Sequence, residues 1–141
     1  MSYLLDTNVL SELRRRKPDA QVVQWMKERP ATTLYLSVLT LGELRKGIEA
    51  LPDSSRKRLL LDWLEIDLPG FFTGRVLPVD VRVANRWGHL LAQAKRPLPA
   101  IDSLLAATAL THGLTLVTHN LRDFQHPGLE IIDPWQAAGT L

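Results

Sequence analysis

The sequence contains no cysteine among its 141 residues, which excludes disulfides, thiolate zinc sites and cysteine nucleophiles. Long apolar runs are also missing, because each one is interrupted well before the ~18 residues that a membrane-spanning helix needs. The first residues lack the basic segment and the long apolar segment of a secretory signal. We therefore expect a cytoplasmic protein.

Excess charge is likewise small, since 17 Lys and Arg residues against 15 Asp and Glu residues give a net charge of +2. That value alone does not predict nucleic-acid binding. Hydrophobic residues make up 45% and charged residues 23% of the chain, which is typical of a globular protein and argues against extensive disorder. The length suits one domain over residues 1–141, with a hydrophobic core large enough to fold without disulfides or a structural metal.

Short apolar segments of strand-forming residues alternate with segments of helical periodicity along the chain. Strands are expected at residues 3–5, 32–37, 75–79, 114–117 and 130–132. Helices are expected at residues 9–16, 20–28, 38–51, 55–68, 81–94 and 101–111. This alternation predicts an α/β domain with a mostly parallel sheet of four or five strands and helices on both faces. Ligands of such sheets bind outside the carboxyl ends of the strands.

Four acidic residues stand near such strand ends or on the adjoining helices. Asp6 ends the first strand, and Glu43 lies on the helix after the second. Asp102 lies in the first turn of the most apolar helix, and Asp123 follows the clearest strand. Each has an ordinary explanation: respectively a helix cap, an ion pair with Lys46, a favourable interaction with a helix dipole, and a turn former.

Convergence of the four carboxylates would change this interpretation. Their mutual repulsion would make the cluster unfavourable without a cation. Carboxylate oxygens are hard ligands that suit Mg²⁺ or Mn²⁺, and these ions bind substrate phosphates and activate water. We therefore expect metal-dependent phosphodiester hydrolysis. Without these four, 11 of the 15 acidic residues remain against 17 basic ones, so a basic surface would surround an acidic pocket.

The motifs around these acids resemble those of PIN-domain ribonucleases, specifically the VapC-type toxins of bacterial toxin–antitoxin pairs. They are LLDTNVL at residues 4–10, LGELRKG at 41–47, IDSLLAATA at 101–109 and LVTHNLRDF at 116–124. All four occur in the family's order, which is far more specific than Asp-Thr-Asn alone. The resemblance implies a PIN-like fold in which Asp6, Glu43 and Asp102 are the metal-binding acids and Asp123 is the fourth, less uniform one.

The same resemblance implies roles for neighbouring polar residues. Thr118 and Asn120 would support the catalytic site or its water, and Thr7 and Asn8 would brace the end of the first strand. One departure from the family pattern is His119, which stands where many relatives carry Arg between the Thr and the Asn.

The family pattern also implies partners. Members are typically homodimers that cleave RNA with Mg²⁺ or Mn²⁺, and they assemble further with a small antitoxin whose C-terminal segment lies along the toxin and obstructs the site. The basic runs at residues 14–17 and 56–58 would guide RNA or meet an acidic antitoxin, although a solvated helix face explains them equally well. The aliphatic helices over residues 38–68 would supply a dimer interface or an antitoxin groove.

Two other functions are compatible with part of this pattern. An aspartate-dependent phosphatase would use Asp6 as its nucleophile, but the usual Asp-x-Asp pattern is absent because residue 8 is Asn. A non-catalytic RNA-binding relative would have no use for mutually repelling carboxylates. The prediction is therefore a metal-dependent endoribonuclease toxin that hydrolyses RNA phosphodiester bonds and is neutralised by a cognate antitoxin.

Overall fold

A five-stranded sheet forms the centre of the computed structural model, which describes residues 1–136. Its strands are β1 (Tyr3–Leu5), β2 (Leu34–Ser37), β3 (Val76–Leu77), β4 (Thr115–Val117) and β5 (Ile131–Ile132). They stand in the order β3-β2-β1-β4-β5, and each neighbouring pair is parallel. The predicted α/β class, with a mostly parallel sheet of four or five strands, is confirmed.

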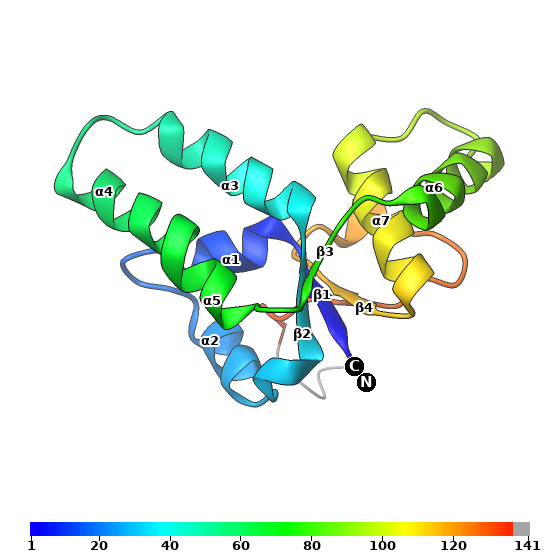
Figure 1. Ribbon diagram of the computed structural model, residues 1–141. Helices are drawn as coiled ribbons and strands as arrows, with labels where there is room; N and C mark the ends of the chain where they lie inside the picture. The colour runs from blue at the N-terminus through cyan, green and yellow to red at the C-terminus, as the bar shows by residue number, and fades with distance from the viewer. Residues whose placement is uncertain (137–141) are drawn as a thin grey trace.

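Helices connect the strands and cover both faces of the sheet (Figure 1). The α-helices are α1 (Thr7–Leu13), α2 (Ala20–Lys27), α3 (Val38–Glu49), α4 (Ser55–Asp62), α5 (Leu68–Phe71), α6 (Val81–Gln93) and α7 (Ala100–His112). Two 3₁₀ turns and one π turn complete the set: η1 (Ala31–Thr33), η3 (Leu121–Phe124) and η2 (Trp63–Asp67). Over residues 1–136, none of these helices combines the length and the apolar character needed to cross a membrane.

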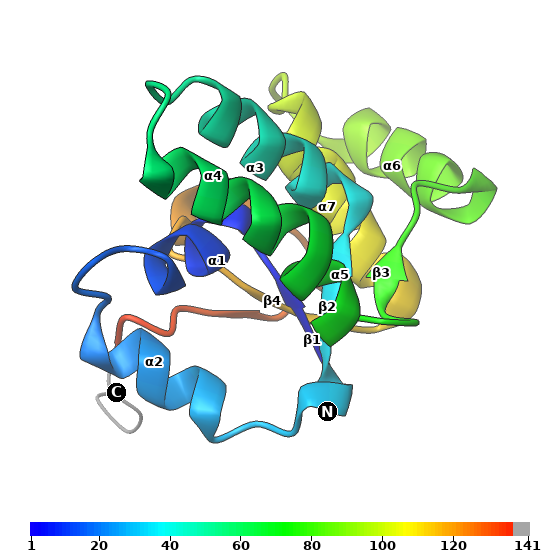
Figure 2. The same cartoon turned by 60° about the vertical axis from the view of Figure 1, so that its left-hand side comes forward.

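Alternation of side chains along the strands divides the core into two halves. Tyr3 and Leu5 of β1 pack on the face covered by α1 to α5, whereas Leu4 packs on the face covered by α6 and α7. Val117 and Leu116 of β4 divide in the same way. Figures 1 and 2 show these two groups of helices on opposite sides of the sheet.

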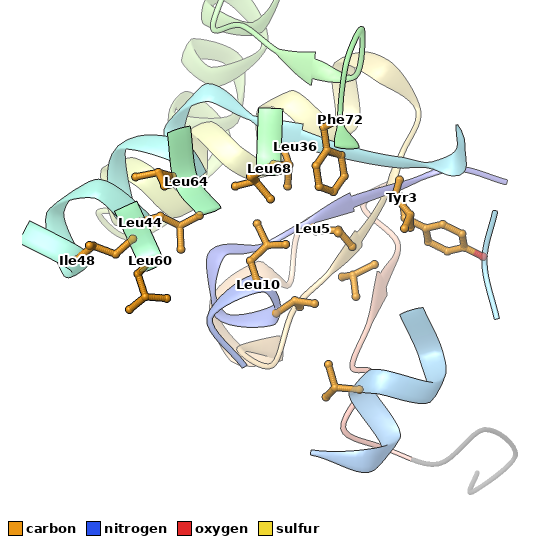
Figure 3. Close-up of a cluster of buried hydrophobic side chains, with 14 residues drawn as sticks. Tyr3, Leu5, Leu10, Leu36, Leu44, Ile48, Leu60, Leu64, Leu68 and Phe72 are labelled. Carbon is orange, nitrogen blue, oxygen red and sulfur yellow. The ribbon is translucent and has the colours of Figure 1, made fainter. Parts of the chain in front are cut away.

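The first half of the core fixes the arm formed by α3, α4 and α5 against the sheet (Figure 3). Leu44 and Ile48 of α3 pack with Leu60 and Leu64, which lie on α4 and the π turn that follows it. All four side chains are buried. This packing holds α3, which carries the second acidic motif, in a defined position beside β1 and α1.

Some element boundaries differ from the sequence-based expectation. The helix expected to stop before Pro69 and Gly70 instead continues to Phe71. The π turn η2, in which the amide of Leu68 donates to the carbonyl of Trp63, precedes the proline and widens the hydrogen-bond pattern there. Proline has no amide hydrogen and clashes in a regular helix interior, so this local change lets the chain stay helical. At the other end of the chain, the first helix expected over residues 9–16 already ends at residue 13.

Candidate active site

The carboxyl ends of β1, β4 and β5 lie at one edge of the sheet, and polar residues follow them. The amide of Asp6 donates to the carbonyl of Val117 at 2.9 Å, and the amide of Thr118 donates to the carbonyl of Ile132 at 2.9 Å. These bonds extend the strand pairing by one residue and place Asp6 beside Thr118. Ser37 ends β2 at the same edge, where its hydroxyl caps α3.

Asp6 is buried at the end of β1, with 7% of its surface exposed. Its Oδ1 accepts from the Thr7 amide at 2.7 Å, and its Oδ2 accepts from the Thr118 hydroxyl at 2.8 Å and the Asn8 side-chain amide at 3.3 Å. Burial raises the pKa of Asp6, and the charge of Glu43 adds to the rise, while the bonds from Thr118 and Thr7 partly offset it. Asp6 is therefore the cap of α1 and also a member of an acidic cluster.

Glu43 reaches the cluster from α3. Its Oε1 accepts a hydrogen bond of 2.5 Å from the Thr7 hydroxyl, which connects two residues 36 positions apart in the chain. The ordinary explanation, an ion pair with Lys46, is not found among the described residues. Glu43 is also exposed rather than set against a buried face. Thr7 thus joins the first and second acidic motifs.

Asp102 lies in the first turn of α7 and is partly exposed. Its pKa is raised from the ordinary 3.8 to about 6, first by burial and then by the charges of Asp6, Asp123 and Glu43, in that order. Each of the other three predicted acids therefore acts electrostatically on Asp102.

Asp123 lies in the 3₁₀ turn η3, and its neighbours hold it in place. The Asn120 side-chain amide donates to Asp123 Oδ2 at 2.8 Å, and the Asn120 backbone amide donates to the Thr118 hydroxyl at 3.0 Å. The same hydroxyl donates to Asp6. Thr118 and Asn120, predicted as site residues, thus link Asp6 to Asp123 through hydrogen bonds and position both acids.

A groove of about 640 Å³ opens over this part of the molecule. Its lining residues are Asp6, Thr7, Asn8, Ser11, Glu12, Arg15, Glu43, Asp102, His119, Asn120 and Trp135. Three of the four predicted acids therefore share one groove, whereas Asp123 is not among its lining residues. Within residues 1–136, no three Asp, Glu or His side chains already stand in an arrangement that could hold a metal ion.

The groove contains residues that the motif analysis did not select. Ser11, Glu12 and Arg15 come from α1 and the turn after it. The spacing Thr7–Ser11 and Asn8–Glu12 is the helical i, i+4 relation, which could have placed these side chains on the same face as the first motif. Trp135 follows the strand expected at residues 130–132, so the strand-end rule could have pointed to it, but only the pairing of β5 with β4 shows which groove it lines.

The basic runs are largely engaged in contacts within the chain. Arg14 lies over the Trp63 ring at 5.2 Å, and the Arg56 guanidinium donates to the Arg14 carbonyl at 2.8 Å. The Lys57 ammonium donates to carbonyls at the end of α3. Arg15 pairs with the buried Glu12 at 3.1 Å. These contacts give several of the basic residues structural roles.

The chain is similar to known proteins over nearly its whole length. The family model described as the PIN domain matches residues 3–128. "VapC ribonuclease Y4jK" of Sinorhizobium fredii (strain NBRC 101917 / NGR234) is 39% identical over 138 residues, covering 96% of this chain and 99% of the relative.

Solved structures give the same comparison in three dimensions. A crystal structure of FitAcB from Neisseria gonorrhoeae has a TM-score of 0.90 at 36% identity, covering 96% of this chain and 99% of that one. A toxin–antitoxin complex from Klebsiella pneumoniae has a TM-score of 0.68 at 26% identity, covering 96% and 100%.

Proposed function

The chain belongs to the PIN domain family, and from this premise we propose that it is a metal-dependent endoribonuclease toxin neutralised by a cognate antitoxin. The similarity to a VapC ribonuclease and to a toxin–antitoxin complex, each over nearly the whole chain, supports the two halves of this proposal.

One observation carries the proposal: Asp6, Glu43 and Asp102 line one groove, where burial and the neighbouring charges raise the pKa of Asp102 to about 6. Carboxylates that repel one another cost stability, and strongly perturbed acids are typical of functional sites. A purely structural role for these four positions would be served better by neutral residues.

The chemistry of the donor set fits a divalent metal. The four acids offer oxygen donors only, which suit Mg²⁺ or Mn²⁺, and a cation would relieve their repulsion. We assign Asp6, Glu43, Asp102 and Asp123 as the residues that would hold it, after their side chains turn toward a common point. When bound, such an ion polarises a phosphoryl oxygen and lowers the pKa of water.

The other polar residues of the site act on the acids. Thr118 and Asn8 orient the Asp6 carboxylate, Thr7 holds Glu43, and Asn120 holds Asp123. Such bonds fix the direction of each carboxylate before substrate binds, so a smaller entropy cost of orienting these groups is left to the reaction. We therefore assign Thr118 and Asn120 as positioning residues for the acids.

An apolar groove next to the acids supports inhibition by an antitoxin segment. It has a volume of about 170 Å³ and lies between α1, α3 and α4, with Leu44, Ile48, Leu60 and Trp63 in its lining. Glu43 lines both this groove and the acidic one. A helical or extended peptide with apolar anchors that bound here would lie beside the site and obstruct it.

We propose the homodimer as the state of the free toxin. Exposed apolar side chains along α4, η2 and α5 support it, since Leu59, Ile66 and Phe71 are 64%, 67% and 50% exposed. Apolar side chains gathered on one arm are typical of association surfaces. Size-exclusion chromatography with light scattering would measure the mass, and a monomer at micromolar concentration would contradict this part of the proposal.

RNA cleavage by the purified protein tests the enzyme proposal. We expect the wild type to cut single-stranded RNA in Mg²⁺ or Mn²⁺, and to stop in EDTA. Asp6→Asn keeps the shape of the buried side chain and removes its charge, so it should be inactive, whereas Asp62→Asn, an exposed change on α4, should cut normally. Cleavage that is indifferent to metal, or normal cleavage by Asp6→Asn, would contradict the mechanism.

The two alternatives from the sequence would give different results in the same assay. A phosphatase would release phosphate from a small phosphomonoester and leave internal RNA bonds intact. A non-catalytic relative would bind RNA without cutting it. No observation in the molecule favours either over the ribonuclease.

A further inference from the structure

Two aromatic rings stand on the rim of the acidic groove. His119 follows β4 and Trp135 follows β5, and their ring centroids are 4.2 Å apart with planes inclined by 31°. Both residues line the groove that Asp6 and Asp102 also line. They contribute the only aromatic rings in this lining, as far as the described residues show.

A single carboxylate contacts the His119 ring and the backbone of Trp135. Asp133, which directly follows β5, has a side chain only 7% exposed. Its Oδ1 lies 3.3 Å from His119 Nδ1 and accepts from the Trp135 backbone amide at 2.9 Å. Because a carboxylate only accepts, Nδ1 carries the proton in this contact when Asp133 is ionised. Asp133 thus holds the His119 ring and the backbone of Trp135, and the two rings pack on each other.

The pair is connected directly to the acidic cluster. The Asn8 side chain accepts from the His119 backbone amide at 3.3 Å and donates to Asp6 Oδ2 at 3.3 Å. Thr118, which bonds to Asp6, is the residue before His119. His119 is thus one bridging side chain away from the most buried acid of the site.

The exposure of the rings indicates a ligand rather than core packing. The His119 side chain is 57% exposed although Asp133 and Trp135 both contact its ring. Trp135 is partly exposed and packs with its remaining surface against the main core. A histidine needed only for packing would be buried between its neighbours.

An RNA strand entering this groove meets carboxylates that repel its phosphates. Its bases carry no charge, and unpaired bases stack on His and Trp rings with little dependence on sequence. An aromatic pair beside the acids can therefore attract the RNA through its bases, although the carboxylates repel its phosphates. We propose that His119 and Trp135 form a stacking platform that holds one unpaired base of the RNA substrate beside the carboxylates. The inference rests on the proposed ribonuclease function and deepens it by naming a contact to a base.

Binding of two strands with equal charge tests the platform. One probe is a fluorescein-labelled strand of twelve adenosines, and the other is a twelve-unit abasic ribose-phosphate strand. The protein carries Asp102→Asn, which should prevent cleavage and touches neither ring, and Mg²⁺ is present. Fluorescence anisotropy gives both dissociation constants. We expect the adenosine strand to bind more tightly than the abasic strand.

Variants of the rings should remove this preference. Adding His119→Ala or Trp135→Ala is expected to weaken adenosine binding about 5- to 100-fold, the range of a lost base stack, and to leave abasic binding unchanged. His119→Phe retains a ring and should recover part of the preference. His89→Ala, an exposed histidine change on α6, is the matched control and should alter neither strand.

Three results would overturn the platform: equal binding of the two strands by the Asp102→Asn protein, binding of neither strand, or equal losses for both strands in the ring variants. Thermal unfolding identifies any ring variant that fails to fold. If Trp135→Ala fails to fold, His119→Ala still provides the test, because it removes only an exposed side chain. Failure of the ribonuclease proposal is recognised separately, because the wild type would then not cut RNA at all.

Discussion

Replacing Asp102 with asparagine is expected to make the metal-free protein more stable while removing its cleavage of RNA. The substitution keeps the size of a partly exposed side chain at the start of α7 and removes a charge that three other acids repel. A pKa raised from 3.8 to about 6 corresponds to an upper limit of ~3 kcal/mol at neutral pH. Solvent screening of the exposed part reduces this, and we expect about 1 kcal/mol.

The pH dependence has a definite sign. A carboxyl whose pKa is raised in the folded state contributes stability when protonated, and this contribution is complete below pH 3.8 and lost as the pH rises through about 6. The advantage of Asp102→Asn should therefore be full at pH 7 and small at pH 4.5. Urea unfolding in EDTA at the two pH values measures it, with Asp62→Asn as the control.

Divalent metal should reverse the order of stability. A cation that binds the folded cluster stabilises the wild type in proportion to its occupancy, and it should stabilise Asp102→Asn much less. The reasoning is refuted if Asp102→Asn lowers the stability of the metal-free protein at pH 7, or if the difference from wild type is the same at pH 7 and pH 4.5.

Three further predictions concern the frame of the site. Thr118→Val removes a buried hydroxyl that donates to Asp6, so the free energy of unfolding measured in urea should fall by about 1.5–3 kcal/mol. Thr118→Ser keeps the donor and should lower it less, and equal losses would contradict the role of the bond. Glu12→Ala removes the buried acceptor of the Asp19 amide and should lower the free energy of unfolding by about 1–3 kcal/mol. A loss below about 0.5 kcal/mol would show that this link between α1 and α2 is dispensable. Gly113→Ala places a side chain at φ +65° where α7 ends, so the melting temperature should fall by an amount equivalent to about 1 kcal/mol, and an unchanged value would refute the strain.

The strand-end rule explains why much of the site was predictable. Asp6 and Thr118 were placed from short apolar segments alone, because parallel strands bring their carboxyl ends to one edge. The prediction that Asp6 caps a helix is also confirmed, and the same side chain both caps α1 and belongs to the acidic cluster. The contact of Glu43 with Thr7 was beyond such reasoning, since it depends on how α3 packs against α1.

Features that depend on tertiary pairing were not predictable. A strand at residues 130–132 was expected, but the sequence does not show that it pairs with β4, and this pairing brings Trp135 to the groove and Asp133 beside His119. The π turn before Pro69 likewise has no local signal, because the sequence around it suggests a helix end. The basic runs were compatible with a solvated helix face or with a contact to RNA or an antitoxin, and the contacts of Arg14 and Arg56 within the chain depend on tertiary packing that the sequence does not show.

Binding of Mn²⁺ to the purified protein, followed by calorimetry or by electron paramagnetic resonance of the free ion, tests the central claim most directly. The proposed metal site predicts saturable binding by the wild type and by Asp62→Asn. Asp6→Asn, Glu43→Gln and Asp102→Asn should each weaken that binding by about 10- to 100-fold or more, because loss of a ligand exceeds the usual cost of losing an outer partner. No Mn²⁺ binding by the wild type, or undiminished binding by all three variants, would contradict the assignment of these acids as a metal-dependent active site.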